Sequence, residues 1–541
     1  MIKDIFNRLS AAVSRIFNPA PPGPPSKPPE LPVISPPPSP SPINAQPVPV
    51  TDPVKVNLVP AEVVRKSPPR RPPKMWNIGL DFGTAFTKCI VRDLGSDDAF
   101  IVPLSRDQFL LPSEVLVGKN SLGLAGEAVD VEQPFRVQNL KMTLAELAAG
   151  KNSGVWAGDF LRLSERYPHA PLAANAAGLT VYFLARAIQK AKAFISQKSP
   201  DFDEANGDRC FLNMAVPVAH AEKNAIANKF DACLRQAWLL ARESNLPKWD
   251  QQQVGEAIKN LNGTFSAGEL PCYLYPEVSA NVQSYIKSRA GADGLYLFVD
   301  VGAGTVDLSI FIYYTHPSND RPITYVEAGV LPLGSSQIEI RAAHRISQNP
   351  LSAMAYCDGV SVTDKDLLQF KLQEIIRSIK EGRKRDEPLY QAMKAAETAI
   401  EADLFDQAAK VLGGAQLKLV RDANGRNRPA GVHQWRTLNL LIGGGGARTA
   451  LYSNAVNAWF EQCCHFTPDR KPIPLPQDLK WPTELSTARY ASEFSRFTVA
   501  YGLSFDRTNL EDHRFPKEVR PLASVHEEPR NRHHAPSKDE C

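Results

Sequence analysis

Apolar residues gather in short runs that end in glycine at three places along the chain. The clearest is residues 295–314, where alternating Val, Leu, Ile and Phe flank the turn 302–305 and predict two antiparallel strands. Residues 76–91 show the same order of strand, glycine turn and strand. A third apolar strand, over residues 438–442, precedes the four consecutive glycines 443–446. The sequence therefore predicts three glycine turns, each at the end of a strand.

Elsewhere the apolar residues recur at helical spacing. Residues 172–195 and 221–243 predict helices, and the apolar run over residues 211–218 predicts a buried strand between them. Because strands and helices alternate, we expect an α/β fold. The 541 residues exceed one compact core, so two lobes or domains are expected. Shorter predicted elements are strand-like pieces over residues 100–103 and 115–117. They are followed by a segment over residues 135–142 that contains Lys141, a helical region extending to about residue 412, a helix from about residue 447 and a closing helix over residues 491–504.

The first 18 residues are predicted to form an amphipathic helix. Their apolar side chains recur at helical spacing, and Lys3, Arg8 and Arg15 are among the polar residues between them. These polar residues also interrupt any signal-peptide core. Two interpretations stay open. The helix is either a peripheral membrane anchor, which basic residues favour on anionic lipid, or it docks on a protein partner or on the globular part of the chain.

Two segments are predicted to lack a core of their own. Residues 19–74 contain 21 of the 46 prolines and predict an extended, semi-rigid linker to a globular domain over residues 75–507. Residues 508–541 are polar and rich in Arg, His, Glu and Pro, so we expect a disordered tail. Pro-x-x-Pro spacings in the linker could recruit proline-binding modules, although a passive linker is favoured.

Charge and cysteine content narrow the class of protein. The net charge of +4 hides an asymmetry, because residues 1–75 carry ten Lys or Arg against four Asp or Glu and leave about −2 for the rest. This balance argues against nucleic acid as the main partner. Eight scattered cysteines without a Cys-x-x-Cys pair favour the reducing cytoplasm, and no run of 18 apolar residues predicts a membrane span. A cytoplasmic protein is expected, with the inner face of the membrane as a candidate peripheral location.

The glycine turns also carry acids. Asp81 leads the first turn, and Asp300 and Asp307 flank the second. Glycine lets backbone N–H groups approach an anion closely, but carboxylates beside a bare phosphate would repel it. A divalent cation between them removes this conflict, so the sequence predicts a phosphate and magnesium site. The chain has neither a Walker A loop nor the G-x-G-x-x-G fingerprint of dinucleotide sites.

The order and spacing of these turns resemble the ATPase superfamily that contains actin, the seventy-kilodalton heat-shock chaperones and sugar kinases. The motif Asp81-Phe-Gly-Thr resembles its first phosphate loop, residues 300–307 (DVGAGTVD) its second, and residues 444–448 (GGGAR) its adenosine motif. The chaperone branch is the most similar, since residues 276–280 (PEVSA) resemble its glutamate motif. The likeness covers about residues 76–507. Only about 34 residues follow, so we expect no peptide-binding domain of the chaperone type.

The resemblance implies two RNase H-like lobes that close over Mg-ATP, lobe I at about residues 75–292 with 486–507 and lobe II at about residues 293–485. It implies that Asp81 and Asp300 bind magnesium through waters. The implied catalytic residues are Glu277, Asp307, Lys141 and Lys88. The implied cofactor-binding residues are Gly83, Thr84, Gly302, Gly304, Thr305, Gly334, Gly444, Gly445, Arg448, Glu374 and Arg377.

Three of these assignments have alternatives. The chaperones carry a phosphate lysine where Lys141 lies, whereas actin-like members carry it seven residues after the loop aspartate, where Lys88 lies. Glu374 and Arg377, one helical turn apart, either hold the adenosine or form an ordinary surface ion pair. Glu277 either orients the attacking water or is a solvated carboxylate at the start of a helix.

Three hypotheses about function follow from the sequence. The first is a chaperone-like, magnesium-dependent ATPase switch that residues 1–18 tether to a membrane or to a protein partner. The second is a filament-forming ATPase of the bacterial actin kind, which Lys88 favours and which would self-assemble. The third is a small-molecule kinase, for which the sequence offers no recognisable catalytic base.

Overall fold

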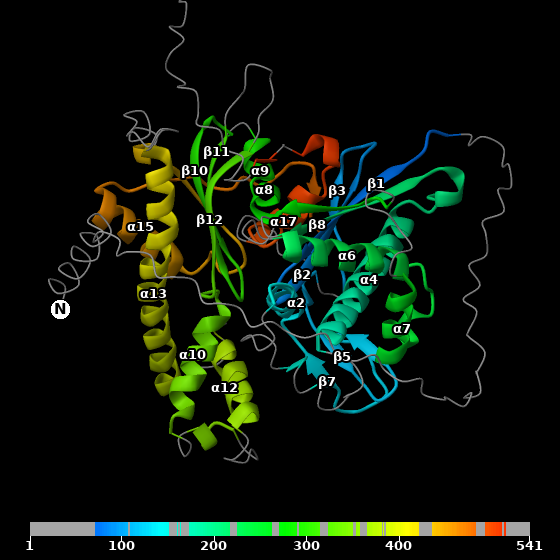
Figure 1. Cartoon of the computed structure of the whole chain (residues 1–541), viewed down its shortest axis with the longest axis horizontal. Helices are drawn as coiled ribbons and strands as arrows, with labels where there is room; N and C mark the ends of the chain where they lie inside the picture. Colours follow the sequence, from blue (N-terminus) through cyan, green and yellow to red (C-terminus); the bar gives the residue numbers. More distant parts are fainter. Residues whose placement is uncertain are drawn as a thin grey trace, which may run out of the picture. The chain divides into compact units, whose positions relative to one another are not determined.

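The computed structural model (Figure 1) describes most of the chain after residue 70. The described residues are 71–105, 109–150, 159–160, 163, 172–216, 224–261, 270–288, 291–313, 323–349, 353–357, 365–380, 382, 386–420, 435–482, 493–510 and 513–514. By its contacts the chain divides into Met1–Arg65 and Lys66–Cys541, and all described residues belong to the second unit. The predicted N-terminal helix, the proline-rich segment up to residue 70 and the tail beyond residue 514 lie outside the described residues.

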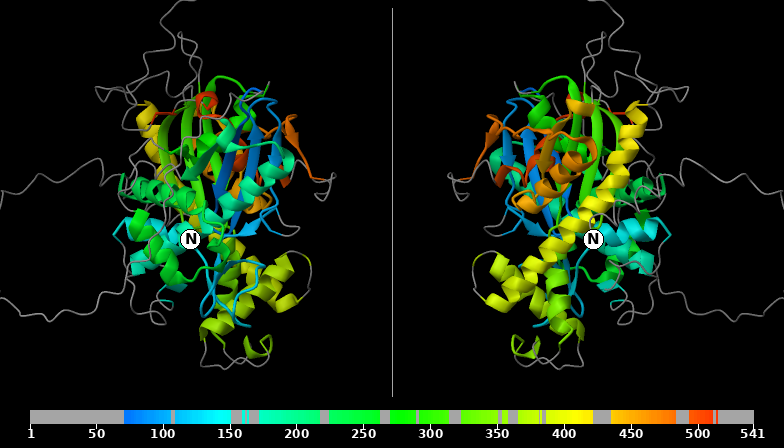
Figure 2. Two further views of the ribbon diagram at one scale, coloured as in Figure 1. Left: turned by 90° about the vertical axis from the view of Figure 1, so that its right-hand side faces the viewer. Right: turned by 90° about the vertical axis from the view of Figure 1, so that its left-hand side faces the viewer.

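The described part of the chain is a mixed α/β protein with two large sheets and one small sheet (Figures 1 and 2). The first sheet has the order β15 (Leu479–Lys480), β3 (Ala99–Ile101), β2 (Phe86–Asp93), β1 (Met75–Phe82), β8 (Arg209–Val216) and β9 (Cys272–Pro276), with β4 (Leu111–Pro112) on β2. The second has the order β14 (Asp469–Arg470), β13 (Asn439–Gly443), β10 (Gly294–Val301), β11 (Val306–Tyr313), β12 (Ile323–Leu331) and β16 (His513–Arg514). The small sheet has the order β6 (Leu122–Leu124), β5 (Val115–Val117) and β7 (Phe135–Val137).

The two large sheets share one pairing order. In the first, β1 pairs antiparallel with β2, β2 pairs antiparallel with β3, and β1 pairs parallel with β8, which pairs parallel with β9. In the second, β10, β11, β12, β13 and β14 repeat this sequence of pairings. Each sheet is thus built around a hairpin of two eight-residue strands, with an antiparallel strand on one side and parallel strands on the other.

Helices pack on both sheets. Beside the first sheet, α4 (Leu172–Lys198) contacts α2 (Leu140–Ala148), α6 (Asn224–Leu240) and α7 (Gln251–Leu261), and their apolar side chains share one core with β1, β2 and β8. Beside the second, α13 (Glu387–Val420) packs along β12 and contacts α10 (Ser336–Ser347), α12 (Lys365–Lys380) and α15 (Ala450–Cys464). Figures 1 and 2 show α10 and α12 beside one end of α13.

Short helices connect the cores of the two sheets. They are α8 (Glu277–Asn281), α9 (Gln283–Ile286) and α17 (Thr498–Leu503). Short 3-10 helices elsewhere in the described chain are η1 (Glu204–Asn206), η2 (Leu246–Lys248) and η4 (Arg507–Asn509). Ala280 of α8 packs in one apolar core with α17 and the first sheet, whereas Val278 of α8 and Tyr285 of α9 pack in another with the second sheet. The segment from residue 277 to residue 286 therefore contacts both sheets. Burial of its apolar side chains fixes where Glu277 lies.

Most of the elements expected from apolar spacing are present. The two predicted hairpins are β1–β2 and β10–β11, and the predicted helix over residues 172–195 is α4. Residues 135–142, to which the sequence assigned no element, are divided between a strand that ends at Val137 and α2, which contains Lys141. Asn139 has a left-handed backbone with φ of 56°, which breaks the strand before the helix begins. The closing helix is shorter than predicted, since α17 covers only Thr498–Leu503.

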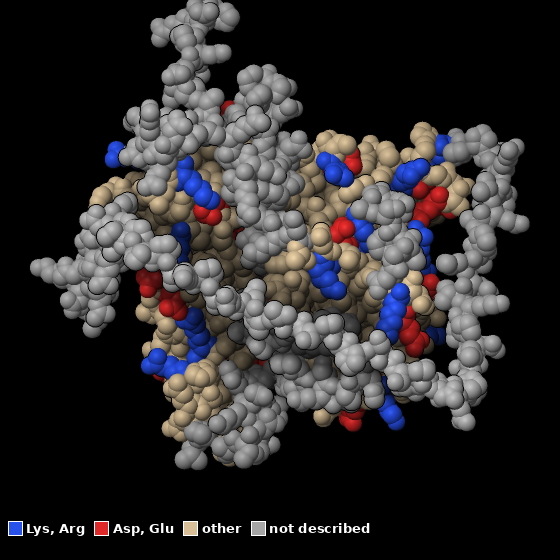
Figure 3. All heavy atoms as spheres, viewed as in Figure 1, with Lys and Arg blue, Asp and Glu red and all other residues tan. Residues whose placement is uncertain are grey.

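The described surface carries both positive and negative side chains, as the nearly balanced charge of the residues after 75 predicts. Figure 3 shows blue and red side chains interspersed over the described part of this face, without a continuous basic surface there. Among the helices of the described ranges, none combines the length and apolar character needed to cross a membrane.

Candidate functional site

Strand pairing sets the positions of the candidate acids. In the first hairpin Asp81 lies opposite Lys88, and in the second Asp300 lies opposite Asp307. Directly opposed residues of antiparallel strands project to the same face of the sheet, with Cβ atoms about 5 Å apart. Asp300 also pairs in parallel with Gly443 of β13. The second and third glycine turns are therefore neighbours.

Backbone hydrogen bonds join the second glycine turn to the segment before α10. Within the turn, Gly302 N donates to Thr305 O at 2.9 Å. Gly334 N donates to Gly304 O at 3.2 Å, and Ser335 N donates to Gly302 O at 2.9 Å. A Cβ atom at Gly334 would clash with the backbone of the turn, so only glycine fits there. The predicted phosphate-binding glycines of this region thus form one packed unit.

The third glycine turn lies against Asp300. Gly444 has a positive φ of 83°, and a Cβ atom there would clash with Asp300 Oδ1. Gly446 N donates to Val301 O at 2.9 Å, which fixes the turn to the end of β10. Among the described atoms, none lies within 4 Å of the Cβ position of Gly445. One side of this turn is therefore open.

Four carboxylates are buried or half-buried around the first two turns. Asp81 is 2% exposed, Asp300 5% and Asp307 8%, and the Glu277 side chain is 12% exposed. Asp300 Oδ2 accepts from Asn281 Nδ2 at 2.9 Å, and Asp307 Oδ2 accepts from the Thr305 hydroxyl, whose Oγ1 lies 3.1 Å away. The other oxygens of Asp81 and Asp307, the Oδ1 atoms, are buried and have no hydrogen-bond partner among the described residues.

This crowding shifts the pKa values of the two acids in the second hairpin. Burial raises the pKa of Asp300 well above its ordinary value, and the nearby carboxylates of Glu277, Asp307 and Asp81 raise it further. Burial and Glu277 raise the pKa of Asp307 to about 7, against the opposite effect of Lys141. Like charges held close in a dry environment favour the protonated form. The site therefore lacks positive charge.

Two lysines supply part of the missing positive charge. Lys88 Nζ lies 2.8 Å from Asp81 Oδ2, and Lys141 Nζ lies 3.0 Å from Glu277 Oε2. Burial lowers the pKa of Lys141, but the carboxylates of Glu277, Asp81 and Asp307 outweigh this effect and raise it. Lys141 thus stays charged. With both lysines and all four acids ionised, the formal charge of the site is −2.

The remaining predicted site residues lie either in the first glycine turn or outside the two hairpins. Thr84 is half-buried in the first turn, where Gly83 N donates to Asp81 O at 3.1 Å. Glu374 and Arg377 are exposed on α12. The pKa of Arg136 on β7 is raised mainly by its hydrogen bond to Glu114 and to a smaller extent by the charge of Glu374. The Arg448 side chain pairs with Glu493 at 2.6 Å.

Asn281 is a site residue that the sequence analysis missed. It lies four residues after Glu277 on α8, so both side chains project from the same side of that helix. Its amide nitrogen donates to Asp300, and its Oδ1 atom is buried and finds no hydrogen-bond partner in the part of the chain that the structure describes. The spacing of four from Glu277 is a signal that could have identified it.

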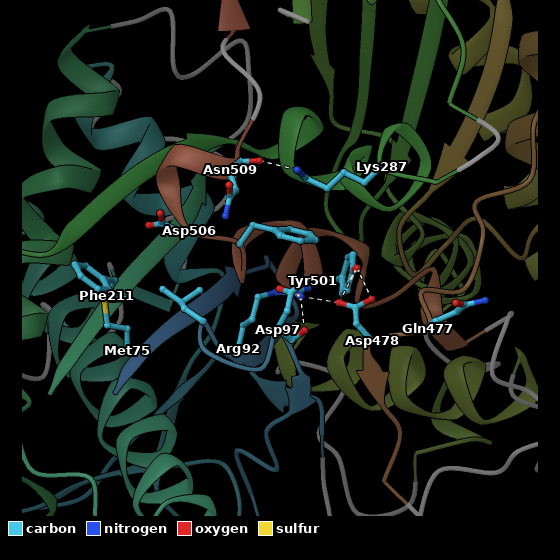
Figure 4. Close-up of a pocket in the computed structure, with 12 residues that line it drawn as sticks. Met75, Arg92, Asp97, Phe211, Lys287, Gln477, Asp478, Tyr501, Asp506 and Asn509 are labelled. Atoms are coloured by element: carbon cyan, nitrogen blue, oxygen red, sulfur yellow. Dashed lines mark hydrogen bonds and ion pairs between the residues drawn. The ribbon is translucent and has the colours of Figure 1, made fainter. Parts of the chain in front are cut away.

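A separate pocket of about 750 Å³ lies at the opposite end of the first sheet from Asp81 (Figure 4). Arg92 of β2 forms part of its lining, and its side chain is only 1% exposed. The guanidinium pairs with Asp97 at 2.7 Å and Asp478 at 2.6 Å, and it lies 3.8 Å from the ring centroid of Phe505. These contacts join β2 to the segment after α17, so we interpret them as a structural link.

Comparison with known proteins gives no family assignment. No protein-family profile matches the sequence, and no curated protein matches it significantly. The geometry of the glycine turns and their acids therefore carries the functional interpretation.

Proposed function

We propose that the protein is a magnesium-dependent ATPase of the actin, heat-shock chaperone and sugar kinase superfamily. In this proposal the two large sheets are the cores of two RNase H-like lobes, with the nucleotide between them. The repeated pairing order of the two sheets supports it, because the superfamily is built from two such lobes. The convergence of acids and glycine turns is the observation that carries it: Asp300 pairs with Asp307 on one side and with Gly443 on the other.

The residues present suit a magnesium ion. Within the described ranges the buried Oδ1 atoms of Asp81, Asp307 and Asn281 have no hydrogen-bond partner, and carboxylate and amide oxygens are ligands that Mg²⁺ prefers. Among the described residues, no three His, Cys, Asp or Glu side chains are grouped so that they could hold a metal ion directly. Mg²⁺ usually keeps several of its waters, so we propose that Asp81 and Asp300 bind it through water. When bound, the ion would neutralise charge on the phosphate oxygens.

We propose roles in hydrolysis for the individual side chains according to their charge. Thr84 and Thr305, with the amides of Gly83, Gly302, Gly304 and Gly334, would bind the phosphates. The carboxylate of Asp307 has a pKa of about 7 and an unpartnered Oδ1 atom, so it is suited to accept a proton from the attacking water. Glu277 would orient that water, and Lys141 would offset phosphate charge beside it. Catalysis of this kind rests on positioning and charge neutralisation.

The third turn and α12 would hold the adenosine. The open side of Gly445 leaves room for a nucleotide next to Asp300 and the phosphates. Gly444 would form the floor of this part of the site. The base and ribose would be bordered by Arg448, Glu374 and Arg377. For Arg448 this requires exchange of its present partner, Glu493.

At the level of the whole protein we propose a chaperone-like switch. ATP would close the two lobes and hydrolysis would reopen them, and this would change what docks on their surface. Residues 1–18 would tether the switch to a protein partner or to the inner face of the membrane. A cytoplasmic location is part of this proposal.

One observation favours a second candidate function. Lys88 contacts Asp81 at 2.8 Å and holds the position of the actin-type lysine. A self-assembling, filament-forming ATPase is therefore the alternative. Sedimentation of the full-length protein with and without ATP distinguishes the two: a filament pellets with ATP, whereas a monomeric switch stays in the supernatant.

The ATPase proposal is tested by phosphate release from ATP with magnesium. We expect slow turnover by the full-length protein and a loss of at least 100-fold in Asp300→Ala, about 3 kcal/mol of transition-state stabilisation. Asp469→Ala is the matched control, because its carboxylate is 68% exposed and it pairs with Asn439, at the other end of β13 from the Gly443 that pairs with Asp300. Equal turnover by wild type and Asp300→Ala, with both proteins folded by circular dichroism, would exclude the proposal.

A further inference from the structure

Lys88 lies beside the buried acid of the first hairpin, Asp81. Its ammonium is 2.8 Å from Asp81 Oδ2, and the pair is well shielded, with side-chain exposures of 16% for Lys88 and 4% for Asp81. Nζ also lies 3.4 Å from the position that a Cβ atom would take on Gly83. The ammonium therefore sits between the acid and the first glycine turn.

The second hairpin shows what happens without such a lysine. Lys88 comes seven residues after Asp81 and opposite it in the ladder, and Asp307 holds the same two relations to Asp300. Each hairpin thus opens with an acid, but only the first places a cation opposite that acid. Lys141 does not replace Lys88 there, because its ammonium is bonded to Glu277.

An ammonium and a hydrated divalent cation cannot share this place. Both need the same carboxylate oxygens, and two positive charges a few ångströms apart repel each other strongly in a partly buried site. The lysine side chain is long and flexible, however, and its ammonium already borders the first glycine turn. A small movement would carry it from Asp81 to an anion bound on that turn.

We infer that the Lys88 ammonium occupies the divalent-cation position beside Asp81 in the nucleotide-free protein, so that magnesium enters only together with a triphosphate that draws the lysine away. The inference rests on the proposed ATPase function and adds an order to it. Lys88 neutralises Asp81 in the nucleotide-free protein and excludes free metal. The triphosphate then exchanges one cation for the other.

The test measures binding of Mn²⁺ alone, which serves as a spectroscopic substitute for Mg²⁺. Free Mn²⁺ is counted by electron paramagnetic resonance in titrations of the full-length wild type, Lys88→Met, Lys88→Arg and the double variant Lys88→Met/Asp81→Asn, all without nucleotide. We expect weak binding by wild type and Lys88→Arg, and at least tenfold tighter binding by Lys88→Met. The double variant should lose this gain, because Asp81 no longer carries a charge.

The outcomes separate this inference from the proposed function. If wild type and Lys88→Met bind Mn²⁺ equally while both bind ATP, the exclusion role is wrong and the ATPase proposal stands. A gain that persists in the double variant also overturns the inference, since the metal would then bind elsewhere. If folded wild-type protein binds neither ATP nor Mn²⁺ with ATP, the proposed function itself fails. Lys88→Gln replaces Lys88→Met if the latter does not fold.

Discussion

The two central hairpins have the same length, the same pairing order and the same spacing of seven between their charged residues, yet they carry opposite charge patterns. In β1–β2 the opposed pair is Asp81 and Lys88, an acid and a base 2.8 Å apart. In β10–β11 the opposed pair is Asp300 and Asp307, two acids whose pKa values are raised. One backbone arrangement therefore supports a neutral pair in one sheet and an acidic pair in the other.

The difference shows how a fold separates stability from function. The first hairpin balances its charge internally and needs no ligand to do so. The second hairpin holds two carboxylates in a buried place, which costs free energy until a cation or a proton neutralises them. Such strain is typical of functional sites, because stability alone would not keep two buried acids together. Removing one charge should therefore have opposite effects in the two hairpins.

The largest expected effect is in the first hairpin. Lys88→Met leaves Asp81 buried without its partner, so we expect the nucleotide-free protein to lose about 3 kcal/mol of unfolding free energy. Urea denaturation followed by circular dichroism measures this loss. The double variant Lys88→Met/Asp81→Asn should recover most of it. A single variant as stable as wild type would show that the pair does not hold the first hairpin.

In the second hairpin the sign should reverse. The pKa of Asp307 is about 7 in the folded protein and near 3.8 in the unfolded chain, so the folded state binds the proton more tightly. Its contribution to stability is complete below pH 4 and is lost as the pH rises to 7. Asp307→Asn should remove this loss and be more stable than wild type at pH 8 by on the order of 3 kcal/mol. Denaturation curves at pH 4, 6 and 8 provide the measurement, and a difference independent of pH would contradict the assignment.

A smaller effect is expected where the third turn meets Asp300. Gly444→Ala places a Cβ atom against Asp300 Oδ1 on a backbone with positive φ, so we expect a loss of about 2 kcal/mol and weaker ATP binding. Gly445→Ala is the matched control, because among the described atoms none lies within 4 Å of its Cβ position. Thermal unfolding of both variants decides the matter. Equal melting temperatures would mean that the turn tolerates the side chain.

The smallest effect is expected outside the hairpins. Arg448 is 42% exposed and pairs with Glu493, so Arg448→Ala should change unfolding free energy by less than about 0.5 kcal/mol. If its side chain borders the adenosine, the same variant should raise KM for ATP by a few-fold with kcat nearly unchanged. Steady-state kinetics test this split. An unchanged KM would remove Arg448 from the site.

Local sequence pattern predicted the hairpins well and their surroundings less well. Alternating apolar residues determine a buried strand, so the positions of Asp300 and Asp307 at the ends of β10 and β11 followed from the sequence. The short segment before Lys141 could not be assigned from the sequence, because three residues of strand and the first turn of a helix look alike at that length. Whether such a segment forms a strand or a helix depends on which of its faces are buried, and tertiary packing decides that burial.

Contacts between residues that are far apart in the sequence could not be predicted from local sequence patterns. Lys141 of α2 and Glu277 of α8 are 136 residues apart, and only the tertiary fold brings their charges together. The spacing of Glu374 and Arg377 placed them on one turn of a helix, but it could not tell which way α12 would turn that face. Lys88 was the reverse case. Its distance of seven from Asp81 made it a candidate phosphate lysine beside Lys141, and the hairpin register places it opposite Asp81.

Isothermal titration calorimetry with ATP tests the central claim most directly. Full-length protein should bind ATP at one molecule per chain in the presence of magnesium, and at least tenfold more weakly in excess EDTA, because the acids then face the triphosphate without a divalent cation. Asp300→Ala should lose this dependence on magnesium. Folded wild-type protein that gives no heat with ATP or ADP would contradict the account.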